Sequence, residues 1–103
     1  MPFQVFGGWT EESAQRLIGK VVYQHYSPAK AMRITAVELR PSLLEGGYDL
    51  NWLTGVDSKG IKIRVSANYI GGFLEDLIAD HHKKIGTLTK LLNKVRMAEE
   101  VKR

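Results

Sequence analysis

The spacing of apolar residues along the chain changes at Gly71-Gly72. Before this point, apolar and polar residues alternate over short runs, which is typical of strands with one buried face. After it, apolar residues recur at intervals of three and four, which is typical of a helix with one apolar side. The pattern predicts an α+β chain in which a small sheet precedes a long amphipathic helix.

Four short strands are predicted within residues 20–70. They cover residues 21–26, 32–39, 48–56 and 61–66. The apolar phase of the second strand changes near Ala36, which predicts a bulge or bend there. A tight turn ending at Gly60 joins the last two strands, and this hairpin is the clearest local structure in the sequence. A strongly bent strand within a short antiparallel sheet predicts a small β-barrel.

Two helices flank the predicted barrel. A short helix over about 10–18 begins with Thr10 as its N-cap. The long C-terminal helix covers about 72–98, and one side of it forms an apolar seam. The seam consists of Ile78, His81, Ile85, Leu88, Leu92 and Val95. We predict one continuous helix because the spacing stays in phase across Gly86, although a helical hairpin broken at that glycine remains an alternative.

The length of the C-terminal helix suggests association. A continuous helix of this extent would be roughly 39 Å long at 1.5 Å per residue. A compact domain of this size has a diameter of only about 33 Å. We therefore expect its first turns to dock on the barrel and its later turns on a second copy, with a dimer favoured.

The strand pattern with its glycine hairpin resembles the SH3-like small barrels. The segment Val65-Ser66-Ala67-Asn68-Tyr69-Ile70 is similar to the Pro-Ser-Asn-Tyr-Val stretch that closes signalling SH3 domains. This resemblance would place the peptide-groove tyrosine of that family at Tyr69. The proline is missing here, and no tandem tryptophan follows the acidic loop. The resemblance therefore implies the fold and no proline-peptide activity.

The hairpin and the C-terminal helix also carry exposed bases. Trp52 shares its phase with Leu50, so we expect its ring in the interior, whereas Lys62 and Arg64 fall on the solvent side of the hairpin. An acid-free basic run follows in the helix. Its members are Lys83, Lys84, Lys90, Lys94 and Arg96. Two explanations remain for this run: complementation of the helix dipole, or contact with nucleic acid.

Composition limits the classes of protein. The 103 residues form one domain, 1–103, with 44% apolar and 25% charged residues and a net charge of +4. Such a weak positive charge permits nucleic-acid binding without requiring it. The absence of cysteine removes disulfides and thiolate chemistry. The opening residues contain no basic leader, and no run is long enough to span a membrane, so we expect a cytoplasmic protein without membrane contact.

No catalytic, cofactor or metal site is predicted. His81 and His82 point about 100° apart on a helix and cannot share one metal from the same side. Asp76 and Asp80 share a side, but Asp80 also precedes Lys84 by four residues, a spacing typical of helix-stabilising ion pairs. We expect a non-enzymatic small-barrel interaction module that self-associates through its C-terminal helix. The alternative is a nucleic-acid-binding accessory protein.

Overall fold

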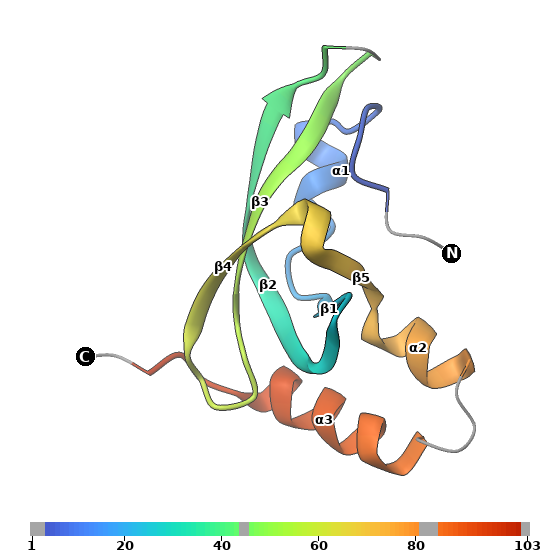
Figure 1. Ribbon diagram of the computed structural model, residues 1–103. Coiled ribbons are helices and arrows are strands. Elements are labelled where there is room, and N and C mark those ends of the chain that lie inside the picture. Colours follow the sequence, from blue (N-terminus) through green and yellow to red (C-terminus); the bar gives the residue numbers. More distant parts are fainter. Residues whose placement is uncertain (1–3, 44–45, 81–84, 102–103) are drawn as a thin grey trace.

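The computed structural model describes residues 4–43, 46–80 and 85–101 and has an α+β fold (Figure 1). Its five-stranded antiparallel sheet has the order β4-β3-β2-β1-β5. The strands are β1 (Val21–Gln24), β2 (Ser27–Pro41), β3 (Tyr48–Val56), β4 (Lys62–Ser66) and β5 (Ile70–Phe73). The helices are α1 (Glu11–Gln15), the short 3₁₀ helix η1 (Ala67–Tyr69), α2 (Leu74–Asp80) and α3 (Ile85–Met97). The predicted α+β class is confirmed.

The short helix α1 begins as predicted. The hydroxyl of Thr10 accepts a hydrogen bond from the Ser13 amide at 3.0 Å, and the Thr10 amide donates to the Ser13 hydroxyl at 2.9 Å. This reciprocal capping satisfies amides that have no partner within the helix. The regular helix ends at Gln15, earlier than predicted, and the buried side chains of Ala14 and Leu17 hold this segment on the sheet.

The long strand β2 contains the predicted irregularity. Its register with β3 shifts between Ile34 and Ala36, which confirms the bulge predicted near Ala36. A second shift occurs where Leu39 pairs with Leu50 while Glu38 pairs with Trp52. One extra residue of β3 lies between these pairs, and it reverses the alternation of faces. Trp52 is therefore half-buried on the face opposite Leu50, and the interior position predicted for its ring is wrong.

The hairpin between β3 and β4 matches its prediction. The Asp57 amide donates to the Ile61 carbonyl at 3.0 Å, and the Asp57 carboxylate accepts from the amides of Lys59 and Ile61. Gly60 has φ +81°, a conformation that costs glycine little. The turn therefore fixes the register of β4 on β3.

The sheet is not closed into a barrel. Strand β5 pairs with β1, and β4 pairs with β3, so these two strands form the opposite edges of the sheet (Figure 1). Residues Gly71 and Gly72 belong to β5 and precede the helix instead of beginning it. The ring of Tyr23 crosses them, and a Cβ atom on Gly71 would lie 2.5 Å from Tyr23 Cε2. Close packing of a ring on backbone thus explains Gly71.

The sheet has two faces with separate apolar clusters. The main core lies on one face and contains the fully buried Val22, Ile34 and Leu53. On the other face, Val21 and Ala31 form a second cluster with side chains from both C-terminal helices. Burial on both faces explains why neighbouring residues of β1 and β2 are apolar instead of alternating.

The single helix predicted over 72–98 is wrong. Helix α2 ends at Asp80, α3 begins at Ile85, and the two pack against each other and against β1. Both helices bury residues in one cluster, with Leu74 of α2 and Leu92 of α3 each at most 6% exposed. A straight helix could not bring its two halves onto the same small patch of sheet. Gly86, proposed as a break point, lies inside α3.

Arg33 anchors the end of α3. Its guanidinium donates to the carbonyls of Val95, Arg96 and Ala98 at 2.9, 2.6 and 2.8 Å. These contacts satisfy carbonyls at the negative end of the helix dipole. Beyond the helix, the Val101 amide donates to the Gly60 carbonyl at 2.8 Å, so the C-terminal segment contacts the β3–β4 hairpin.

None of the helices in the described ranges combines the length and the apolar character needed to cross a membrane.

Candidate binding surface

The part of the sheet formed by β3 and β4 carries exposed charged side chains around a half-buried tryptophan. Its residues lie on the face opposite the main core, because directly paired residues of neighbouring strands share a face. Glu38 pairs with Trp52, and Thr54 pairs with Arg64. Lys62 precedes Arg64 by two residues in the same strand and so lies on the same face. We call Glu38, Trp52, Thr54, Lys62 and Arg64 the Trp52 face.

Arg64 stacks on the centre of this surface. Its guanidinium carbon lies 4.2 Å from the centroid of the Trp52 ring, within the range of a cation–π contact. Its Nη2 atom also donates to Glu38 Oε2 at 2.7 Å. Both partners of this ion pair are 51% exposed, so we assign it at most about 1 kcal/mol of stability. Arg64 is thus held in a defined position by contacts on two sides.

The Trp52 face lies on the same side of the sheet as α2 and α3, beside the part of β1 and β2 that these helices cover. Helices α2 and α3 pack mainly on β1, β2 and β5, and α1 packs on β2. Figure 1 shows the β3–β4 hairpin beside the C-terminal end of α3, and β4 leading from there to η1. A half-buried indole with a stacked guanidinium and a nearby carboxylate can offer apolar contact, cation–π contact and hydrogen bonds to a partner.

The residues predicted for self-association lie mostly inside the chain. Those with described side chains are Ile78, Leu88, Leu92 and Val95. Leu88, Leu92 and Val95 are 7%, 6% and 0% exposed in the second apolar cluster, and Ile78 packs against its edge. His81 and the side chain of Ile85 lie outside the described residues. Self-association stays a prediction, but the three buried side chains are already covered by β1, β2 and α2.

The predicted nucleic-acid contacts are spread over two elements. Lys62 and Arg64 lie on the Trp52 face, whereas Lys90 and Lys94 are exposed on α3. Arg96 forms an ion pair with Glu75 of α2. Lys83 and Lys84 fall outside the described residues. Arg64 and Arg96, two of the five described bases, are thus paired with carboxylates of the same chain, which reduces the positive charge available for phosphate.

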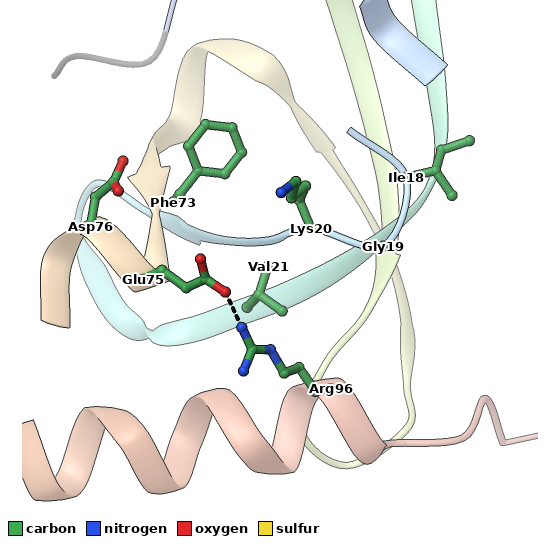
Figure 2. Close-up of a pocket in the computed structure, with 8 residues that line it drawn as sticks. All are labelled: Ile18, Gly19, Lys20, Val21, Phe73, Glu75, Asp76 and Arg96. Atoms are coloured by element: carbon green, nitrogen blue, oxygen red, sulfur yellow. Dashed lines mark hydrogen bonds and ion pairs between the residues drawn. The ribbon is translucent and has the colours of Figure 1, made fainter. Parts of the chain in front are cut away.

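A hollow of about 460 Å³ lies where β1 meets α2 and α3 (Figure 2). The ion pair between Glu75 and Arg96 joins the two helices there, and Figure 2 shows it beside Val21 of β1. Lys20 and Asp76 add one charge of each sign to the lining. The charged groups therefore balance, and the hollow offers little net attraction for an ion. We interpret this ion pair chiefly as a contact that holds α2 and α3 together.

The described part of the chain contains no group of three histidine or acidic side chains that could hold a metal ion. Among the same residues, Asp49 is the buried charged side chain, at 6% exposed. It accepts a hydrogen bond from the Gly7 amide at 2.6 Å and forms an ion pair with Arg40 at 3.5 Å. Its contacts give Asp49 a structural role, in which it fastens the N-terminal segment to β3.

Sequence reasoning identified Lys62 and Arg64 but missed Trp52 and Glu38 as their surface neighbours. The missed signal is the opposite phase of Leu50 and Leu53, both of which are core residues. They are three positions apart, so regular alternation would place them on opposite faces. Both can face the core only if β3 contains one extra residue between them, and the face of Trp52 then depends on where that residue lies.

A scan against protein-family models, a search of curated proteins and a search of solved structures each returned no match for this chain. The function proposed below therefore comes from the geometry and charges of the chain itself.

Proposed function

We propose that the protein is a non-enzymatic interaction module that binds a partner protein through the Trp52 face. The observation that carries the proposal is the guanidinium of Arg64 at 4.2 Å from the Trp52 ring centroid, on a part of the sheet beside the region that α2 and α3 cover. Tryptophan and arginine are enriched at the energetic centres of protein interfaces. A rigidly placed pair also loses less side-chain freedom on binding than two mobile side chains would.

We also propose that the sheet is an unclosed relative of the SH3-like small barrels. The support is topological: four strands follow one another as neighbours, and a 3₁₀ helix leads into β5, which returns to pair with β1. Tyr69, which the resemblance assigns to the peptide groove, is 54% exposed in that 3₁₀ helix. The proposed binding surface does not include Tyr69, because the Trp52 face belongs to β2, β3 and β4.

The direct test compares Trp52→Ala with Tyr26→Ala in co-purification from a native lysate. Tyr26 serves as a control for the loss of an aromatic ring outside the proposed surface, because it is 88% exposed and lies in the turn between β1 and β2. Removal of an interface tryptophan typically costs 2 kcal/mol or more, about a 30-fold loss of affinity. We expect Trp52→Ala to lose a partner that Tyr26→Ala retains, with both variants folded by circular dichroism. Equal capture by the two variants would refute the proposal.

Nucleic-acid binding is the second candidate function, favoured by Trp52 and Lys62 on the same face. Stacking on an aromatic ring next to basic side chains is the usual way of binding single strands. Its signature is an affinity that falls steeply with salt concentration. We would titrate random single-stranded DNA and RNA at low salt and follow tryptophan fluorescence. Absence of binding would remove this candidate and leave the protein-binding proposal unaffected.

A further inference from the structure

Strand β4 forms one edge of the sheet, and its outward backbone groups follow from the hairpin. The Asp57 amide donates to the Ile61 carbonyl, so Ile61 pairs with β3 by hydrogen bonds. In an antiparallel pair such residues alternate with residues whose amide and carbonyl point away. Ile63 and Val65 therefore face β3, whereas Lys62 and Arg64 present both backbone groups to the outer edge. Ser66 presents only its amide there, because its carbonyl, at the N-cap of η1, accepts the first bond of that helix. In the described residues, β4 pairs with no strand other than β3.

One backbone hydrogen bond on this edge is already made. Gly60 lies in the turn that precedes β4, and its carbonyl accepts from the Val101 amide at 2.8 Å. The contact shows that an extended chain can approach the edge at its hairpin end.

We propose that β4 accepts an extended acidic peptide of the partner protein as a sixth strand of the sheet. This inference rests on the proposed function and names the kind of partner. Added strands are recognised by backbone hydrogen bonds for affinity and by alternate side chains for specificity. The amides and carbonyls of Lys62 and Arg64 and the amide of Ser66 would supply the backbone bonds.

The side chains along β4 define the peptide that fits. Lys62 and Arg64 project to one face, so acidic residues of the peptide on that side would meet cations. Glu38 offsets part of the charge of Arg64, which leaves Lys62 as the stronger attraction. On the other face, Ile61 is 47% exposed and Ile63 is half-buried, so apolar residues fit there. The complementary sequence alternates acidic and β-branched apolar residues.

The same charges argue against a second copy of β4 as the occupant. In a symmetric antiparallel pairing centred on Arg64, that residue would face its own counterpart. Like charges directly opposite each other destabilise strand pairing. Lysine on an exposed edge strand is in addition a common protection against self-pairing.

The experiment uses the full chain and a seven-residue peptide that alternates valine and glutamate. Nuclear magnetic resonance would measure amide hydrogen exchange with and without the peptide. We expect exchange at Lys62, Arg64 and Ser66 to slow at least about tenfold, because these amides gain partners. A peptide N-methylated at the residues that face β4 should not bind, whereas one methylated at the intervening residues should bind normally.

Charge reversal provides the protein-side test. Lys62→Glu should weaken binding of the acidic peptide about 5- to 30-fold, since a favourable cross-strand pair becomes a repulsive one. The matched control is Lys90→Glu, an exposed position on α3, which should change affinity less than twofold. Absence of binding at millimolar peptide, or equal binding of the two methylated peptides, would overturn the inference.

The two proposals can fail separately. If Trp52→Ala loses its partner while that partner leaves the β4 amides unprotected, the proposed function stands and strand addition fails. If the peptide protects the edge while Trp52→Ala keeps every partner, strand addition stands and the Trp52 face fails as the main interface.

Discussion

Replacement of Arg33 by methionine tests how the end of α3 is held. The guanidinium of Arg33, on β2, donates to three carbonyls at the end of α3 at 2.6 to 2.9 Å. Two of these hydrogen bonds are partly buried. Hydrogen bonds to charged groups contribute about 1.5–3 kcal/mol, but partial exposure lowers this to about 0.5–1 kcal/mol each. The helix dipole adds about 0.5–1 kcal/mol. We expect Arg33→Met to lower the free energy of unfolding by about 3 kcal/mol.

The assay is urea unfolding followed by circular dichroism, together with a thermal melt. For 103 residues, an unfolding entropy of about 2.1 cal/mol/K per residue converts 3 kcal/mol into a melting temperature about 14 °C lower. The m-value should stay the same, because the surface exposed on unfolding is unchanged. Arg33→Lys keeps the charge but loses the fork of donors, so it should fall between methionine and wild type.

Arg16→Met is the matched control for this prediction. Arg16 forms an exposed ion pair with Glu12 on α1, with side chains 77% and 83% exposed, and its loss should cost less than about 0.5 kcal/mol. A loss below about 1 kcal/mol for Arg33→Met, or one no larger than that of Arg16→Met, would refute the anchoring role of Arg33.

Three further substitutions test the core and the glycines. Leu92→Ala should lower the free energy of unfolding by about 2–5 kcal/mol, because Leu92 is 6% exposed within the chain's own second cluster. The mass in solution, measured by sedimentation, should stay the same. A smaller mass with unchanged stability would mean that this side chain packs between copies. Gly86→Ala should raise stability by up to about 1 kcal/mol, since it lies in α3 with nothing within 4 Å of a new Cβ. Gly71→Ala should lower stability, because its Cβ would meet the Tyr23 ring; an opposite order of the two in urea unfolding would contradict this account.

Local patterns predicted the elements whose causes are local. The cap at Thr10, the bulge near Ala36 and the hairpin ending at Gly60 each depend on a few neighbouring residues, and the structure confirms all three. Strand β5 was missed because its Gly71-Gly72 pair has little strand propensity alone. It forms because the backbone of β1 and the ring of Tyr23 supply its partners.

The Trp52 face was predicted only in part. The alternation of the hairpin placed Lys62 and Arg64 on an exposed face, since a turn of fixed register needs no distant contact. The position of Trp52 depended on one extra residue of β3 at the second bulge, which shows only when the register with β2 is known. Glu38 reaches Arg64 through β3, a contact between residues far apart in sequence.

The sequence by itself determined the class of the fold, the hairpin, the cap at Thr10 and the apolar side of the C-terminal helices, because these follow from periodicity and local geometry. Tertiary structure decided what that apolar side contacts. The seam from Leu88 to Val95 has the spacing of an association surface, but α3 packs against α2 and buries the seam on β1 and β2. The apolar periodicity indicates that a side chain is buried. It does not state which surface covers it, because burial depends on area and not on the identity of the neighbour.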